Sequence, residues 1–348
     1  QTWEPQNYDN KFEGKMPLRR ALYESRNLAT IRLGMELGEA SVIDEARKFG
    51  ITSPIPPYPS IHIGAASVYP IEMVSAYSAF ATLGTRSAPM AIVRVENQKG
   101  DVLWAPTPQR TAVLSPEEAW LMVDMMKDVV RRGTAAGTVG SVFHLPAGGK
   151  TGTTNDGTDV WFIGYTSDLV AGVWMGLDRP QKIKANAQGG VLAAPAWTAF
   201  MNQVYKRKPA PPDWPRPSGL VTESIDVTTN TLWTDGCGGV RTTEYFIPGT
   251  EPTQVCTIQL LPDTTGFGPT TPPDTGMPRP ATQPSNPFAG SVVVPGAVPA
   301  PNPVRLPGRD SARARDSLVF PRSRPRDTSR VRRDTSRVPP PAAGGARR

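Results

Sequence analysis

Apolar residues recur at the three- and four-residue intervals typical of amphipathic helices in five stretches of the chain. These stretches are 18–22, 28–37, 70–84, 116–130 and 195–204. The fourth stretch follows Ser115-Pro116-Glu117-Glu118, a capping box with proline at the first helical position. This signal predicts a helix of about four turns that closes at Arg131-Arg132-Gly133.

Strands are expected where short aromatic and β-branched runs stand between turn residues. The run 160–165 is followed by a turn at Asp168 and by a second run, 170–177, so two neighbouring strands are predicted. Shorter runs at 92–95 and 102–104 flank a Lys-Gly-Asp turn and predict a hairpin. The order of these elements indicates an α+β fold, in which helices cover an antiparallel sheet and a mostly helical subdomain accompanies it.

Composition divides the chain into four parts. They are a main domain at 1–206, a proline-rich linker at 207–219, a small β-like segment at 220–261 and a tail rich in proline and arginine at 262–348. The tail has too few apolar residues to offset the entropy lost on ordering, so we expect it to be disordered.

The net charge of +7 does not belong to the main domain. Residues 305–348 hold 13 Arg and 4 Asp and therefore carry +9, which leaves −2 for the rest of the chain. These arginines are not accompanied by interleaved aromatic residues or by a folded nucleic-acid-binding domain, so a nucleic-acid partner is disfavoured. The first interpretation is a solubilising tail without a specific partner. In an extracytoplasmic protein, anionic envelope polymers or lipid head groups are the partners that fit these charges better than nucleic acid.

The only two cysteines, Cys237 and Cys256, lie in the β-like segment. They are not closely paired in sequence, and only His62 and His144 could complete a metal site, so zinc is disfavoured. A disulfide is predicted for an oxidising compartment, where it would contribute ~3 kcal/mol. Two buried free thiols are the alternative.

The first candidate for chemistry is Lys150-Thr151-Gly152-Thr153, which comes just before the strand-like run 160–165. A cation, two hydroxyls and a residue without Cβ predict a binding edge that traps a carboxylate and lets a ligand backbone lie against the strand. A phosphate-binding P-loop is the rival interpretation, but His144 stands where that pattern requires its first glycine. The remaining alternative is a Gly-Gly turn with an exposed lysine.

The second candidate is Ser25-Arg26-Asn27, which lies between two of the predicted helices. Taken alone, the motif favours an N-cap, in which Ser25 or Asn27 accepts a hydrogen bond from free amides of the second helix.

Taken in order, the two motifs and their surroundings resemble the transpeptidase domain of class A penicillin-binding proteins, the bifunctional peptidoglycan synthases related to serine β-lactamases. The resemblance covers roughly residues 1–205. Besides the two motifs, it rests on Trp3-Glu4-Pro5-Gln6-Asn7-Tyr8-Asp9, Phe12-Glu13-Gly14, Leu18-Arg19-Arg20-Ala21-Leu22, Pro70-Ile71-Glu72-Met73, Ala76-Tyr77, Leu114-Ser115-Pro116-Glu117, Arg132-Gly133-Thr134 and 149–165.

The resemblance implies a penicillin-binding, β-lactamase-like transpeptidase fold that is incomplete at its N-terminal side. The nucleophile of the family is the serine of a Ser-Xaa-Xaa-Lys motif, and no lysine of this chain has a serine three positions before it. We therefore expect the chain to be the C-terminal part of a longer protein and inactive alone. The family further implies an upstream glycosyltransferase, an N-terminal transmembrane anchor and an extracytoplasmic location.

The resemblance also implies roles for the motif residues. Ser25 would relay a proton to the leaving amine, and Asn27 would hold the lysine of the absent motif and donate to the substrate amide. Lys150 would set the electrostatics of the site, and Thr151 and Thr153 would bind the substrate carboxylate beside Gly152. The amide of Thr153 would supply half of the oxyanion hole.

The implied reaction joins peptidoglycan stem peptides through an acyl-serine intermediate, without a cofactor, and β-lactams would occupy the same trap. The scarcity of histidine argues against a Ser-His-Asp hydrolase. Two alternatives stay open, namely a D,D-carboxypeptidase or β-lactamase-like hydrolase and a non-catalytic binding homologue.

Overall fold

The computed structural model describes residues 3–257, and the predicted tail at 262–348 lies outside them, as do the final residues of the predicted β-like segment. The described residues form α-helices and four small sheets. The helices are α1 (Leu18–Tyr23), α2 (Asn27–Leu37), α3 (Glu39–Lys48), α4 (Pro70–Ala81), α5 (Pro116–Arg131) and α6 (Ala193–Tyr205), with short helical turns at Pro59–Ile63 and Ala136–Gly140. The predicted α+β fold, with helices on an antiparallel sheet, is confirmed.

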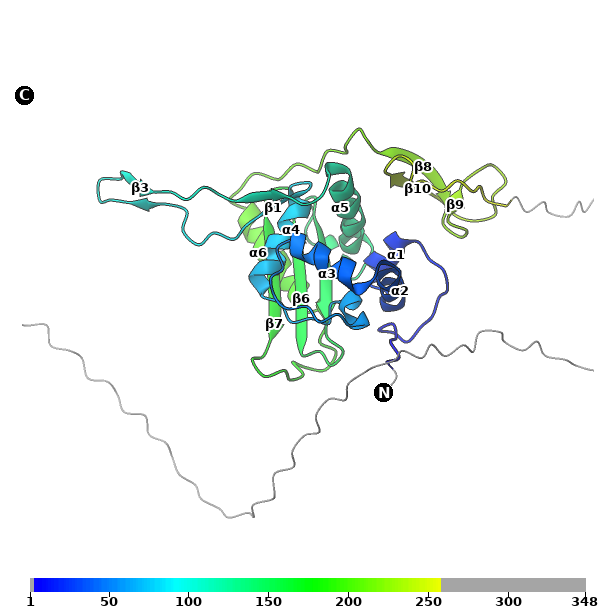
Figure 1. Cartoon of the computed structure of the whole chain (residues 1–348), viewed down its shortest axis with the longest axis horizontal. Helices are drawn as coiled ribbons and strands as arrows, with labels where there is room; N and C mark the ends of the chain where they lie inside the picture. Colours follow the sequence, from blue (N-terminus) through cyan, green and yellow to red (C-terminus); the bar gives the residue numbers. More distant parts are fainter. Residues whose placement is uncertain (1–2, 258–348) are drawn as a thin grey trace, which may run out of the picture. The chain divides into compact units, whose positions relative to one another are not determined.

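The central sheet has three antiparallel strands in the order β5-β6-β7. They are β5 (Gly148–Thr153), β6 (Asp159–Tyr165) and β7 (Val170–Gly176). Helix α5 packs on β5, α4 on β6 and β7, and α6 on β6 and β7 (Figure 1). The two strands predicted at 160–165 and 170–177 are therefore confirmed, and β6 is buried along most of its length because helices cover it.

Helix α5 begins where its sequence predicts. Ser115 accepts a hydrogen bond from the Glu118 amide, the Glu118 carboxylate accepts from the Ser115 amide, and Pro116 occupies the first turn. These contacts satisfy amides that the helix itself leaves free. The capped start fixes the helix whose other end leads into the candidate site.

Helix α6 is held against the sheet by Trp197, a fully buried side chain of the core. Its indole N–H donates to the Gly164 carbonyl of β6 at 3.1 Å. A Cβ at Gly164 would lie 2.7 Å from the indole Cε2, so only glycine leaves room for this contact. The helix predicted at 195–204 is thus confirmed as the one that packs across the sheet.

Helix α3 and the hairpin depart from the sequence prediction. No stretch at 39–48 was predicted as helical, and α3 has no buried residue, which explains its weak apolar signal.

The predicted hairpin forms, but its first strand is β2 (Val95–Glu96), paired with β3 (Val102–Trp104). Residues 92–94 stay outside the ladder. Strands β1 (Thr85–Ser87) and β4 (Arg110–Ala112) form a further antiparallel pair.

The C-terminal described residues form a separate sheet in the order β10-β8-β9. Its strands are β8 (Val221–Asp226), β9 (Thr231–Leu232) and β10 (Arg241–Phe246). Cys237 and Cys256 are joined by a disulfide, so the alternative of two free thiols is wrong. The stretch predicted as a linker contains Trp214, which is buried against α5 and donates to the Ala81 carbonyl at 2.8 Å.

Arg19 connects this sheet to the helices. Its guanidinium donates to Glu244 of β10 at 2.8 Å, to Asp124 at 2.7 Å and to Asp128 at 3.0 Å, the last two on α5. Burial opposes the charge, but the carboxylates outweigh it and raise the pKa of Arg19. One side chain of α1 therefore ties together elements that are far apart in sequence.

Candidate active site

Strand β5 carries the Lys-Thr-Gly-Thr motif at the edge of the central sheet. It pairs with β6 from end to end, with Lys150 opposite Ile163 and Gly152 opposite Trp161. Within residues 3–257 no strand pairs with its other side. Because Lys150 lies inside a strand, the P-loop and Gly-Gly turn interpretations are both wrong. The prediction of an edge is confirmed.

Ser25 lies in the turn between α1 and α2. It has a positive φ of 57°, which is uncommon for a residue with a Cβ. The turn is closed by two backbone bonds, from the Ser25 amide to Leu22 and from the Arg26 amide to Ala21. The left-handed conformation reverses the chain within one residue and leaves the Ser25 side chain partly exposed.

The N-cap interpretation of this turn is wrong. Helix α2 begins at Asn27, its N-cap residue is Arg26, and neither Ser25 nor Asn27 caps it. The amide of Leu28 is satisfied instead by the side-chain oxygen of Asn7 at 3.1 Å. The serine is therefore free of a capping role.

The two motifs meet. The Lys150 ammonium donates to the Ser25 hydroxyl at 2.7 Å and to the Thr151 carbonyl at 3.1 Å. Burial lowers the pKa of Lys150 from 10.5 to about 8, because a charged amine loses solvation there. At neutral pH the group is charged, yet it gives up a proton far more easily than an exposed lysine, and the nearest side-chain oxygen is that of Ser25.

The two threonines of β5 have different neighbours. The Thr151 hydroxyl lies 2.7 Å from the Thr134 hydroxyl. The Thr153 hydroxyl accepts from the Gly189 amide at 3.0 Å, which leaves its own proton available. A Cβ at Gly189 would lie 2.5 Å from the Gly152 carbonyl, so the chain itself packs closely against the glycine of the motif.

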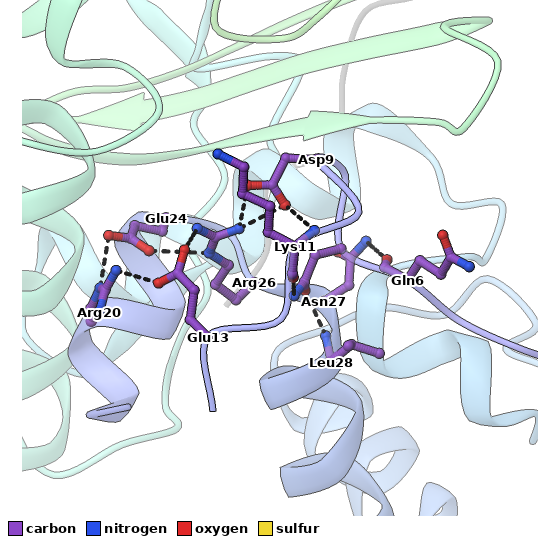
Figure 2. Close-up of polar contacts among 10 residues, drawn as sticks. Gln6, Asp9, Lys11, Glu13, Arg20, Glu24, Arg26, Asn27 and Leu28 are labelled. Carbon is purple, nitrogen blue, oxygen red and sulfur yellow. Dashed lines mark hydrogen bonds and ion pairs between the residues drawn. The ribbon is translucent and has the colours of Figure 1, made fainter. Parts of the chain in front are cut away.

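Asn27 points to the N-terminal segment. Its side-chain amide donates to the Gln6 carbonyl at 2.9 Å, as Figure 2 shows, while Asn7 donates to the Lys11 carbonyl at 2.7 Å. The structure brings Ser25 and Lys150 into contact and gives Asn27 a backbone partner elsewhere.

Arg26, the middle residue of the motif, is the centre of an ion-pair cluster (Figure 2). Its guanidinium pairs with Asp9 at 2.9 Å, with Glu24 at 3.1 Å and with Glu13. Arg20 pairs with the same two glutamates. These pairs hold the N-terminal segment across the turn that presents Ser25.

An open pocket of about 340 Å³ lies beside Ser25. Its lining residues come from the N-terminal segment, from the turn before α2 and from the end of α5. They are Tyr8, Asp9, Glu24, Ser25, Arg26, Arg132, Gly133 and Thr134. The Tyr8 hydroxyl also accepts a hydrogen bond from Gln188 at 2.8 Å, which joins the N-terminal segment to the segment beside β5.

Sequence reasoning missed several of these residues. Thr134 entered only as part of Arg132-Gly133-Thr134, a stretch that carried the resemblance and was given no role. Asn7 likewise entered only within the stretch Trp3–Asp9, and Gly189 was not mentioned. The resemblance was the only signal that could have marked Thr134, because its contact with Thr151 spans separate elements.

Comparison with known proteins decides the family. The family model described as penicillin binding protein transpeptidase domain matches residues 1–202. The chain belongs to this family. A second model, penicillin-binding protein 1A C-terminal domain, matches residues 216–260, which include the β8–β10 sheet and the disulfide. The predicted relationship to penicillin-binding proteins is confirmed.

Curated relatives agree with this assignment. The chain is 35% identical over 254 residues to penicillin-binding protein 1A of Aquifex aeolicus, an alignment that covers 73% of this chain and 34% of the relative. It is 31% identical over 327 residues to the protein of the same name from Pseudomonas aeruginosa, with coverage of 79% and 39%. The chain thus spans little more than a third of these relatives.

Solved structures show the same fold. Penicillin-binding protein 1A from Haemophilus influenzae matches with a TM-score of 0.67 and 26% identity, over 73% of this chain and 43% of that one. The PonA1 protein from Mycobacterium tuberculosis, in complex with penicillin V, matches with a TM-score of 0.52 and 26% identity, over 61% of this chain and 62% of that one.

Proposed function

We propose that the chain forms the substrate-binding edge of a peptidoglycan D,D-transpeptidase that cross-links stem peptides through an acyl-serine intermediate. The observation that carries the proposal is the 2.7 Å contact between Lys150 and Ser25, which come from a strand edge and a helix turn. An ammonium that gives up its proton readily and a hydroxyl in contact with it, beside an open pocket, form a proton-relay pair. The family of the chain supplies the reaction class.

The roles of the motif residues follow from their surroundings. Ser25 exchanges a proton with Lys150 and passes it to the leaving amine of D-alanine. Thr151 and Thr153 each keep a hydroxyl near the sheet edge, where they bind the terminal carboxylate with the ammonium of Lys150. The Thr153 amide donates to the oxyanion. The Asn27 side chain can donate a hydrogen bond to the substrate amide only after it has broken its bond to the Gln6 carbonyl.

The nucleophile of this reaction comes from outside the chain. No lysine among the 348 residues has a serine three positions earlier. We therefore infer that the longer protein supplies a Ser-Xaa-Xaa-Lys motif, that it also carries a glycosyltransferase and a membrane anchor, and that it acts in the cell envelope. Within residues 3–257, the structure contains no helix with the length and apolar character of a membrane span.

A fluorescent penicillin tests the proposal, because β-lactams offer a carboxylate and a reactive amide at the same spacing. The chain alone should give no adduct by intact mass. The longer protein should be acylated, and Lys150→Met should slow this acylation at least ~100-fold, as expected when a preorganised electrostatic group is lost. Lys48→Met is the matched control, because Lys48 is exposed on α3 and its only ion-pair partner among the described residues is Glu45. Normal acylation of the Lys150 variant would overturn the proposal.

A further inference from the structure

Thr134 reaches the strand edge from a different element. It follows the end of α5 through Arg132 and Gly133, and its hydroxyl lies 2.7 Å from the hydroxyl of Thr151. Thr134 is exposed and lines the pocket beside Ser25, so the contact lies where a ligand can reach it. The sequence motifs assign no role to this residue.

The backbone at Thr134 is held on two sides. Its amide donates to the Tyr23 carbonyl at 3.2 Å. A Cβ at Gly133 would lie 2.3 Å from the same carbonyl, and a Cβ at Gly190 would lie 2.4 Å from the Thr134 carbonyl. Both neighbours must therefore be glycine for the turn to pack this closely. The side chain of Thr134 thus projects from a fixed backbone.

Two hydroxyls that are hydrogen-bonded to each other use only one of their two protons in that bond, so the other proton is available to a further acceptor. When Thr134 donates to the Thr151 oxygen, the proton of Thr151 remains free and its direction is restricted by the bond it accepts. The accepted bond also polarises the Thr151 hydroxyl and makes it a better donor. The natural acceptor for such a group is an anion.

The charges near the pair favour an anion. Lys150 precedes Thr151 on β5, and Arg132 lines the pocket with 53% of its side chain exposed. Arg132 is held in place by Asp128 at 2.6 Å and by the Tyr23 ring, whose centroid lies 4.8 Å from the guanidinium carbon. The pocket carboxylates Asp9 and Glu24 are both already paired with Arg26. The pairing with Arg26 offsets part of the repulsion that these two groups would exert on a ligand carboxylate.

We propose that Thr134 is a positioning residue for the carboxylate site, which donates to Thr151 and thereby directs the Thr151 proton at the terminal carboxylate of a D-alanyl ligand. This inference rests on the proposed function. It adds that carboxylate selectivity depends on the turn after α5 as well as on the strand motif.

The test uses the complete 348-residue chain and two ligands, N-acetyl-D-Ala-D-Ala and its C-terminal amide. Ligand-observed NMR titrations give the ratio of the two affinities. Wild type should prefer the acid, and Thr134→Val should reduce that preference about tenfold, the scale of one hydrogen bond to a charged group. Binding of the amide should not change. Thr134→Ser keeps the hydroxyl and should keep the preference.

Two further variants separate this inference from the function on which it rests. Thr151→Val should lose the preference, and the remote exposed control Thr250→Val should keep it. If Thr151→Val loses the preference while Thr134→Val keeps it, Thr134 has no positioning role and the proposed function stands. If Thr134→Ser fails as badly as Thr134→Val, packing is the cause and the inference is overturned. A wild-type chain that does not distinguish acid from amide contradicts both proposals.

Discussion

Two arginine clusters lie close in sequence to the turn at Ser25, and they differ in how well water reaches the carboxylates. The Arg19 side chain is 12% exposed and its three acidic partners are 9–19% exposed. The Arg26 side chain is 14% exposed, but its partners are 25–37% exposed. Arg19 should therefore contribute more than Arg26 to the free energy of unfolding, because the loss of a cation costs most where water cannot solvate the carboxylates left behind.

The clusters also differ in reach. Arg26 joins residues within positions 9–26, whereas Arg19 joins α1 to α5 and to β10, up to 225 positions away in sequence. The Arg26 cluster can hold only the N-terminal segment against its own turn. The Arg19 cluster fixes where that turn stands relative to the rest of the described domain.

The largest effect is expected from Arg19→Met. This substitution leaves Asp124, Asp128 and Glu244 without their shared cation, and it should lower the free energy of unfolding by about 3–5 kcal/mol. Urea denaturation measures the change. The control is Arg32→Met. The Arg32 side chain is 81% exposed and, within residues 3–257, forms an ion pair only with Glu36. A loss below about 1 kcal/mol for Arg19→Met would remove the distinction between the clusters.

Glu244→Gln should have an intermediate effect, because Arg19 retains its two aspartates. We expect a loss of about 1–3 kcal/mol, the scale of a hydrogen bond to a charged group. Hydrogen exchange should show faster opening of β8 and β10 than in wild type. Unchanged exchange there would mean that the C-terminal sheet is held by other contacts, such as Tyr245 on Trp120.

Arg26→Met should cost about 1 kcal/mol or less, because water can solvate the released carboxylates. The local effect should be clearer than the global one. Amides of the N-terminal segment at 6–13 should exchange faster, while those of β10 stay protected. Faster exchange in both regions would show that the two clusters are coupled.

The smallest effect is a difference in acid sensitivity. The bond to Arg26 lowers the pKa of Asp9 below 3.8. Burial raises the pKa of Glu24, but its bonds to Arg20 and Arg26 outweigh burial and lower it below 4.5. Carboxyls with depressed folded pKa values stabilise the fold above their unfolded pKa values, and that contribution is lost as the pH falls through the folded ones.

The measurement is unfolding by urea between pH 5 and pH 2. Wild type should lose stability below about pH 4, and Arg26→Met should lose less over the same interval, because Asp9 no longer has the bond that lowers its pKa and Glu24 keeps only its bond to Arg20. Equal slopes for the two proteins would contradict the assignment of these shifts to Arg26.

Local signals were sufficient for much of the fold. The capping box predicted α5, and the aromatic run predicted β6, because each depends on residues that are neighbours in the chain. Helix α3 was not predicted, because its sequence is polar overall and it buries no side chain. The first strand of the hairpin was predicted a few residues too early. Its start depends on which residues pair with β3, and the apolar pattern of residues 92–95 does not reveal this.

The site depended on information that periodicity does not carry. Only the resemblance placed Lys150 and Ser25 in one site, since 125 positions separate the two residues, and it did not give their direct contact. Thr134, Asn7 and the Arg19 cluster were not expected, because their chemistry arises from contacts between distant elements. Asn27 looked like a groove residue in the motif, yet its partner is a backbone carbonyl that sequence cannot reveal.

The Arg19 cluster has a practical consequence for dividing the chain. A protein shortened at the proline-rich stretch before β8 would lose Glu244 and would leave the guanidinium with two acceptors instead of three. It would also uncover the Trp120 ring on which Tyr245 packs. The boundary that composition suggests would therefore separate Arg19 from one of its three carboxylates. Measurements on such a truncated protein would describe a weakened contact between α1 and α5, next to the Ser25 turn, and not the native one.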